Sequence, residues 1–276
     1  MIEQPFILIS APNGARINKT DHAAVPLTVS ELSDTAERLV ELGVSVLHLH
    51  VRDHDGQHSL DVDHYLAAMA DIEDRIGDQL IIQITTEAVG RYDRHQQMAL
   101  VRALKPEAVS LALRELCPED HHVPEASDFF REVLEQGTWP QYILYSAADV
   151  KRFNHLRKQN VFGEKQPFAL FVLGSYHDKQ PGNPLALDGY LEYCGNSFPW
   201  SVCCFGETEA NAIARAYSLG GHGRIGFENN RLLADGRTAD DNYQLIAETL
   251  ANLTDETVKR PLATAAWIRQ SLMRVS

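Results

Sequence analysis

The feature that most constrains the fold is a regular alternation between short apolar, β-branched runs and longer segments with helical patterns. This alternation is typical of repeated strand–helix units around a parallel sheet. Eight such units in a chain of 276 residues predict a closed (β/α)8 TIM barrel of the α/β class. The expected strands cover residues 6–11, 44–51, 80–87, 108–113, 142–147, 168–174, 200–206 and 223–229.

The segments between these runs predict the outer helices. Thr28 to Glu31 has the sequence of a capping box, so we expect the first helix to begin there and to end at Gly43. An open doubly wound sheet is the main alternative architecture, but no G-x-G-x-x-G motif follows the first run. The later helices are expected at about 62–76, 94–104, 126–137, 148–159, 185–195, 207–219 and 239–253.

We expect residues 1–276 to form one barrel domain, because no low-complexity linker divides the chain. A helical extension is predicted at about 255–276, where the apolar segment PLATAAWIRQSLM exceeds what eight strand–helix units need. This extension is expected either to cover the bottom of the barrel or to pack on another subunit.

Charge and cysteine content limit the possible partners and location. The formal net charge of -13, from 38 acidic and 25 basic residues, opposes binding to nucleic acid or to an anionic membrane. The 4 cysteines are not arranged as C-x-x-C pairs, which favours free thiols in a reducing compartment. No signal peptide or membrane-spanning run is recognisable, so we expect a cytoplasmic protein.

The second expected strand, VSVLHLHVRD, carries two histidines where a buried strand would normally carry aliphatic residues. Residues two apart on a strand share a face, so His48 and His50 project side by side. Neutral imidazoles are common zinc ligands, and this pair can reach one ion. A pair of hydrogen-bonded core histidines is the alternative.

The last expected strand supplies a possible third ligand. Its alternation places Arg224 and Glu228 on the inner face, with Glu228 nearer the rim. The second and eighth strands of a closed barrel both neighbour the first, so His48, His50 and Glu228 can converge. Two histidines and a glutamate with one open position form a known catalytic zinc set. A buried Arg224–Glu228 salt bridge is the alternative explanation for that pair.

Other polar residues are expected at the same end of the barrel. Thr85 and Glu87 lie on the inner parity of the third strand and Ser110 on that of the fourth. Buried polar groups are costly unless they are paired, so an active site explains them better than packing does. The long loop at 11–26 is expected to belong to that site, although a surface Ω-loop is the alternative.

The segments HLHVRD, NGA, QITTE and GGHGRIGFEN together resemble the β-keto acid cleavage enzymes, whose first characterised activity is 3-keto-5-aminohexanoate cleavage. The resemblance runs from about residue 6 to 230. It implies a (β/α)8 fold, one catalytic Zn²⁺ per chain, and a Claisen/retro-Claisen exchange that converts a β-keto acid and acetyl-CoA into acetoacetate and a new acyl-CoA. It also implies a homo-oligomer, for which a homotetramer is the expectation.

Carried over residue by residue, the resemblance makes His48, His50 and Glu228 the zinc ligands and Arg224 the catalytic arginine. The family's proposed base is an aspartate directly after the zinc-binding glutamate, but here that position is Asn229. An amide cannot accept the proton, so either another base serves, for which Glu87 is our first candidate, or the Asn229 amide plays a positioning role in catalysis. Substrate contacts are predicted for Asn13, Arg16, Thr85 and Ser110.

Arg16 is the second departure from the family pattern, because members that accept a cationic substrate tail carry an acid there. An arginine repels an ammonium group and pairs with a carboxylate or a phosphate. We therefore predict an uncharged or anionic β-keto acid, such as a keto dicarboxylate. Contact with a CoA phosphate, or exposure to solvent, are the alternatives for Arg16.

Three rival functions remain open from the sequence. A zinc-dependent barrel hydrolase also uses an H-x-H pair, but it needs further histidine ligands on later strands that we do not find. A metal-dependent, aldolase-like C–C lyase that does not use CoA is another, although related metallolyases place H-x-H late in the chain. A metal-storing barrel is the third rival.

Overall fold

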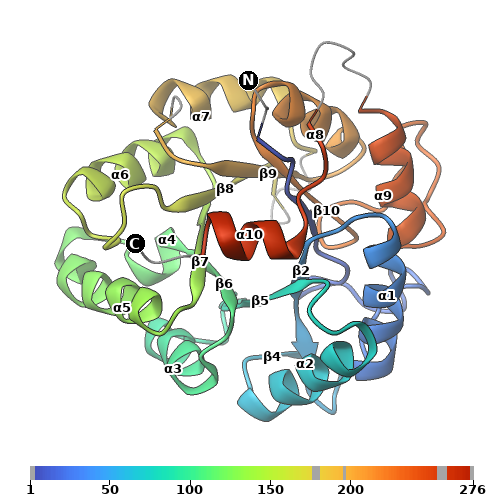
Figure 1. Ribbon diagram of the computed structural model, residues 1–276, viewed down its shortest axis with the longest axis horizontal. Coiled ribbons are helices and arrows are strands. Elements are labelled where there is room, and N and C mark those ends of the chain that lie inside the picture. Colours follow the sequence, from blue (N-terminus) through green and yellow to red (C-terminus); the bar gives the residue numbers. More distant parts are fainter. Residues whose placement is uncertain (1–3, 176–180, 195–196, 254–259, 274–276) are drawn as a thin grey trace.

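Eight parallel strands form a closed barrel in the order β1-β10-β9-β8-β7-β6-β5-β2, which confirms the predicted TIM barrel (Figure 1). The structure is a computed structural model that describes residues 4–175, 181–194, 197–253 and 260–273. The barrel strands are β1 Leu8–Ser10, β2 Val46–Leu49, β5 Ile81–Thr85, β6 Ala108–Ala112, β7 Trp139–Leu144, β8 Phe168–Leu173, β9 Trp200–Cys204 and β10 His222–Ile225.

Helices surround the barrel (Figure 1). The capping box predicted at Thr28 is confirmed, since the Thr28 hydroxyl accepts a hydrogen bond from the Glu31 amide and the Glu31 carboxylate accepts one from the Thr28 amide. No helix among the described residues is long and apolar enough to cross a membrane. The outer helices are α1 Val29–Glu41, α2 Val62–Ile76, α3 Arg94–Leu104, α5 Val123–Glu135, α6 Ala147–Lys158, α7 Leu187–Cys194, α8 Glu209–Ser218 and α9 Asn242–Ala251.

Several short elements lie outside the eightfold repeat, and all of them except the last helix follow the carboxyl ends of barrel strands. A small antiparallel hairpin directly follows β2, and a single helical turn directly follows β6. The hairpin and the turn lengthen the segments that leave the carboxyl ends of β2 and β6. The short elements are β3 Val51–Arg52, β4 His58–Ser59, α4 Leu113–Leu116, η1 Asp120–His122, η2 Pro184–Ala186 and α10 Ala265–Ser271.

All eight barrel strands differ from their predicted ranges by one or more residues, and two of these differences change the description of the site. The strand expected at 142–147 runs from Trp139 to Leu144, because its ladder with β6 begins at Trp139 despite the proline that follows. The strand expected at 223–229 ends at Ile225. Gly226 has a φ of +152°, and a Cβ there would lie 2.2 Å from the Ala11 carbonyl oxygen, so the chain bends away at a position that favours glycine. Glu228 therefore lies on a turn and not on the strand.

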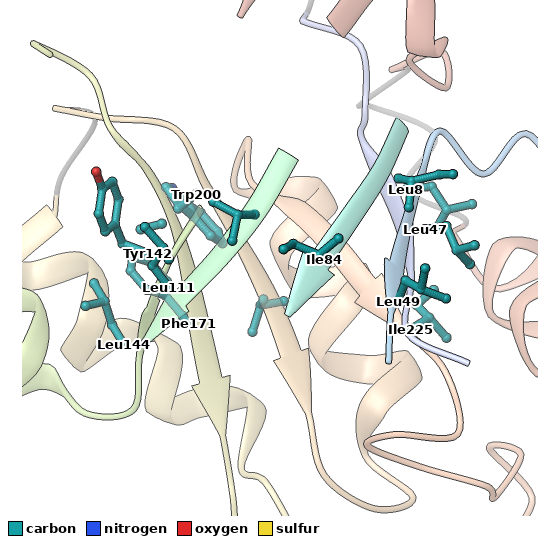
Figure 2. Close-up of a cluster of buried hydrophobic side chains, with 14 of the residues drawn as sticks. Leu8, Leu47, Leu49, Ile84, Leu111, Tyr142, Leu144, Phe171, Trp200 and Ile225 are labelled. Atoms are coloured by element: carbon teal, nitrogen blue, oxygen red, sulfur yellow. The ribbon is translucent and has the colours of Figure 1, made fainter. Parts of the chain in front are cut away.

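The main core lies between the outer face of the barrel and the helices. Leu47, Leu49 and Ile84 project outward into it, as the alternation along each strand requires, and Leu8 and Ile225 lie beside them (Figure 2). These side chains are fully shielded from solvent. Their burial supplies the main hydrophobic stabilisation and leaves the inner face of each strand for other roles.

The C-terminal extension covers the amino-terminal end of the barrel, where α10 lies across the opening (Figure 1). Ile268 is fully buried against inner-face residues such as Val46, Ile81 and Phe168. Arg269 forms an ion pair with Glu107 and holds the helix in place. The apolar surface of this extension is thus used within the chain, as one of the two expected outcomes.

Candidate active site

A cavity of about 200 Å³ opens at the carboxyl ends of the strands, and we call it the mouth cavity. It brings together seven of the ten predicted site residues, from the loops and strand ends around the barrel. Asn13, His50 and Asn229 are buried beside it and do not line it. The predicted residues that line the mouth cavity are Arg16, His48, Thr85, Glu87, Ser110, Arg224 and Glu228.

His48, His50 and Glu228 converge at the wall of this cavity. The Nε2 atoms of the two histidines lie 3.0 Å apart. The Oε2 atom of Glu228 lies 3.4 Å from the His48 Nε2 and 3.2 Å from the His50 Nε2. All three residues are buried, and their donor atoms lie within 4.8 Å of one another.

The spacing of these three atoms fits the coordination of one small divalent cation. Tetrahedral zinc with ligands at its usual bond lengths holds neighbouring donor atoms about 3.3 Å apart. The Oε2 atom of Glu228 is buried without a hydrogen-bond partner, which is costly unless something binds it. The predicted Arg224–Glu228 salt bridge also exists, at 2.8 Å, but it uses only Oε1. The two interpretations of Glu228 are therefore compatible.

A chain of buried amides fixes the orientation of His48. Gln141 donates to the Ser201 hydroxyl at 3.1 Å, and Gln83 donates to the Gln141 carbonyl oxygen at 3.4 Å. The remaining Gln83 oxygen then accepts from the Nδ1–H of His48 at 2.9 Å. Because the proton lies on Nδ1, the Nε2 of His48 presents a lone pair to the cation position.

His50 is oriented through its backbone, at the point where the chain leaves β2. The Asn13 amide donates to the His50 carbonyl oxygen at 2.9 Å and to the Pro26 carbonyl oxygen at 3.0 Å. Asn13 thus joins the two ends of the loop predicted at 11–26 to the metal-binding strand. This loop is part of the site, and Asn13 holds the backbone of His50, a candidate metal ligand, in place.

Burial and charge both favour the protonation states that a metal site needs. Burial lowers the pKa of His48 to about 4 and the pKa of His50 well below its ordinary value, so both imidazoles are neutral at pH 7. Burial opposes ionisation of Glu228, but Arg224 and the two histidines outweigh it and hold the pKa of that carboxyl far below its ordinary value. Glu228 is therefore a carboxylate at pH 7.

Arg224 organises the polar groups on the β10 side of the cavity. One of its terminal nitrogens donates to Glu228 and, at 3.2 Å, to the Oδ1 of Asn229. The same nitrogen lies 3.4 Å from the Sγ of Cys203. Since arginine carries only donors, the Asn229 oxygen must face it, and the Asn229 amide nitrogen remains buried without a partner.

Glu87 lines the same cavity, two residues beyond the end of β5, the strand that pairs with β2. Burial and the neighbouring Glu228 carboxylate raise its pKa to about 7, although Arg16 acts in the other direction. The Arg16 Nε lies 3.7 Å from the Glu87 carboxylate. The Thr85 hydroxyl accepts from the Glu87 amide at 3.1 Å and supports this turn.

Several polar residues of the site have no role predicted from the sequence, although Arg114 is expected in the loop after Ser110. Gln141 and Ser201 belong to the amide chain, and Arg114 and Tyr145 line the mouth cavity. The alternation that selected Thr85 on the third strand would have selected Gln141 if β7 had been placed three residues earlier. Arg114 lies on the helical turn α4, where strand alternation gives no signal.

The sequence is similar to a known enzyme family over nearly its whole length. A model of the beta-keto acid cleavage enzyme family matches residues 5–273. A 3-keto-5-aminohexanoate cleavage enzyme of Fusobacterium nucleatum is 27% identical over 98% of this chain and 98% of its own length. A 3-oxoadipate:acetyl-CoA acetyltransferase of Cupriavidus necator is 25% identical over 98% of this chain and 95% of its own length.

The solved structures agree on the architecture. A ternary complex of ObcA with a C4-CoA adduct and oxalate superposes with a TM-score of 0.69 and 19% identity, covering 90% of this chain and 67% of that one. At this identity the likeness concerns the fold alone.

Proposed function

Because the chain belongs to the beta-keto acid cleavage enzyme family, we propose that it converts a β-keto acid and acetyl-CoA into acetoacetate and a new acyl-CoA. The Cupriavidus necator relative is named 3-oxoadipate:acetyl-CoA acetyltransferase. That name pairs a keto acid with acetyl-CoA and supports this reaction. The observation that carries the proposal is the convergence of His48, His50 and Glu228 on one point beside the mouth cavity.

The exchange is balanced without an oxidant or a reductant. A proton leaves C2 of the keto acid, and C2 forms a bond to the thioester carbonyl carbon as CoA thiolate departs. The thiolate then adds to the original C3 carbonyl, and the C2–C3 bond breaks. The released carbanion of acetoacetate takes up a proton, and the rest of the keto acid leaves as the new acyl-CoA.

Zinc is the cation we propose for the His48–His50–Glu228 set, because two imidazoles and one carboxylate with an open position suit it. When bound there, it would act as a Lewis acid toward the oxygens of the keto acid and would make the C2 proton more acidic. Arg224 contributes a permanent positive charge at the same wall, and it holds the Glu228 carboxylate in place.

We assign the proton transfer to Glu87. Its carboxylate lines the mouth cavity, and a pKa raised to about 7 by burial suits a base that works near neutral pH. Asn229 cannot take this role, but its unpartnered amide can donate to an oxygen that becomes negative during the exchange. Ser110, whose buried hydroxyl also has no partner, is a second donor to substrate.

Arg16 sets the sign of the substrate tail in this proposal. Its guanidinium stands at the rim of the mouth cavity, where it repels an ammonium group and leaves uncharged and anionic tails acceptable. Thr85 contacts the substrate at the cavity floor. Because the two relatives named above act on keto acids of opposite tail charge at nearly equal identity to this chain, overall similarity does not choose the tail.

The decisive assay follows acetoacetate release from acetyl-CoA and a panel of β-keto acids. The panel contains 3-oxoadipate, 3-oxohexanoate and 3-keto-5-aminohexanoate, which differ in tail charge. We expect turnover that stops after treatment with a chelator and returns with Zn²⁺. Activity that is indifferent to metal removal would contradict the proposal, and cleavage without CoA would favour the lyase or hydrolase alternative.

We also propose that the enzyme is a homotetramer, on the basis of the family resemblance, and that it works in the cytoplasm, where its four free cysteines would stay reduced. The C-terminal extension no longer supports this assembly, because its apolar face is buried in the barrel of its own chain. Light scattering of the purified protein measures the mass directly. A mass of one chain, 30.9 kDa, would contradict the tetramer.

A further inference from the structure

Arg114 is a cation of the mouth cavity that the proposed reaction does not use. It lies on α4, just beyond the end of β6, and its guanidinium is stacked on the ring of Tyr145, 3.4 Å from the ring centroid. Tyr145 follows the end of the neighbouring strand β7. Stacking holds the guanidinium plane while leaving its in-plane N–H groups available to a ligand.

The charge of Arg114 is not neutralised by an ion pair. Within the described part of the chain, no carboxylate lies within 4.0 Å of its guanidinium nitrogens. The adjacent Glu115 carboxylate is engaged elsewhere, by the Gln97 amide at 2.6 Å and by the Ala88 amide at 3.2 Å. Arg16, by contrast, already has the Glu87 carboxylate beside it. Arg114 is therefore the cation better prepared to receive a second carboxylate.

The barrel topology places Arg114 across the cavity from the candidate metal site. The candidate metal ligands lie on or directly beyond β2 and β10, the two neighbours of β1. β6 and β7 lie on the far side of the closed strand order. On the side of β6, β7 and β8 the cavity wall includes an apolar patch formed by Ala112, Ile143 and Val172. Such a wall suits a short methylene chain with a charged group at each end.

We propose that the substrate is a 3-oxo dicarboxylate whose distal carboxylate binds Arg114 on its Tyr145 platform. This inference rests on the proposed function, because the keto acid end must lie at the metal site for the tail to reach Arg114. Arg16 then excludes cationic tails, and Arg114 selects the anionic tail over the uncharged one.

The test compares 3-oxoadipate with 3-oxohexanoate, since the two differ only in a carboxylate in place of a methyl group. We expect Arg114→Gln to lower kcat/KM for 3-oxoadipate by about 10- to 100-fold, mainly through KM, as the loss of a charge-assisted hydrogen-bond pair requires. The value for 3-oxohexanoate should change by less than about twofold, since that acid makes no such bond. Arg114→Lys should recover part of the loss.

Two further variants separate selectivity from general effects. Arg102→Gln removes a guanidinium that also lies near an aromatic ring, Phe129, but far from the cavity, and should change neither substrate. Arg16→Gln should affect both acids alike. An equal fall for both acids in Arg114→Gln, or a wild-type preference for 3-oxohexanoate, would overturn the inference.

A binding measurement keeps this inference separate from the proposed reaction. Adipate and hexanoate lack the reactive ketone, so calorimetry on the metal-loaded enzyme needs no turnover. We expect adipate to bind more tightly than hexanoate and Arg114→Gln to remove that difference. If no keto acid is turned over but this pattern holds, the reaction is wrong and the carboxylate subsite stands. If turnover occurs and the two acids bind alike, the subsite is wrong.

Discussion

The two ends of the barrel interior are built from opposite chemistry, although the same eight strands form both. At the amino-terminal end the inner face is apolar and α10 closes it. At the carboxyl end the inner face carries imidazole, amide, guanidinium and carboxylate groups beside an open cavity. Several strands therefore change their inner-face residues from apolar to polar within a few positions, as with Val46 followed by His48 on β2. β8 is an exception, because its inner face stays apolar from Phe168 to Val172.

This difference separates the stabilising part of the barrel from the part that performs chemistry. Even a polar residue at the closed end serves the fold: the His222 Nδ1 accepts from the Ile7 amide at 3.0 Å, and the guanidinium of Arg260 lies 3.3 Å from it. Burial lowers the pKa of His222 to about 3, so it acts as a neutral acceptor. A histidine of this barrel is a candidate ligand or a structural acceptor according to the end at which it lies.

The largest expected effect follows from removing a metal ligand. His50→Ala or Glu228→Gln should reduce bound zinc from about one ion per chain to background and lower kcat/KM by about 10³-fold, because Lewis-acid stabilisation is worth several kcal/mol. Elemental analysis and the acetoacetate assay measure the two quantities. His222→Asn is the control at the closed end, and it should lose stability but retain zinc. Equal zinc loss in both variants would remove the distinction between the ends.

Removing the proposed base should have the next largest effect. A carboxylate accepts a proton only when ionised, so kcat/KM should rise with pH through the pKa of Glu87, which burial raises to about 7. A bound cation offsets the Glu228 charge and places this limb at or below pH 7. Glu87→Gln should be about 10²- to 10⁴-fold slower and should lack the limb.

The neighbouring carboxylate provides the control for this pH profile. Glu115 also lines the mouth cavity, but its Oε2 accepts hydrogen bonds from both the Gln97 side-chain amide and the Ala88 backbone amide. Glu115→Gln should therefore retain the rising limb, whatever it does to the rate. A limb that persists in Glu87→Gln would assign the proton transfer to another group.

At the closed end the expected effect is on stability alone. Ile268→Ala removes a fully buried side chain between α10 and the barrel and should lower the free energy of unfolding by about 2–5 kcal/mol. Zinc content and kcat/KM of the folded enzyme should stay unchanged. Leu66→Ala, at a residue that is 50% exposed, should cost less than about 0.5 kcal/mol. Denaturant titration checks both values, and a loss of zinc in Ile268→Ala would show that the two ends are coupled.

The regular parts of the molecule could be predicted because they depend on local patterns. The alternation of apolar runs and helices identified all eight barrel strands, and period-two alternation placed His48 and His50 on one face. The Thr28 capping box needs only residues within one turn of each other. These signals are short-range, so the sequence alone contains them.

The irregular parts could not be predicted, since distant segments determine them. Strand alternation placed Glu228 on the last strand, but that strand ends at Ile225. The close contact of Gly226 with Ala11 produces the turn that brings Glu228 to the histidines. Gln141 was missed because the pairing of β7 with β6 extends the strand back through Pro140. The stacking of Arg114 on Tyr145 joins two adjacent strand ends that are separated along the sequence.

The smallest expected effect concerns the amide chain that hydrogen-bonds His48, and it tests whether residues that do not contact the metal orient the ligands. Gln83→Leu keeps the approximate volume of the side chain but leaves the His48 Nδ1–H and the Gln141 oxygen without partners. Because such a hydrogen bond fixes the tautomer of a ligand, we expect zinc affinity to fall by about 10- to 100-fold, measured by competition with a chelator. Gln79→Leu removes an amide that bonds only the Ile76 carbonyl, and it should leave the affinity unchanged. Unchanged affinity in Gln83→Leu would mean that the amide chain fills the barrel without orienting His48, and that the functional end begins only at the ligands themselves.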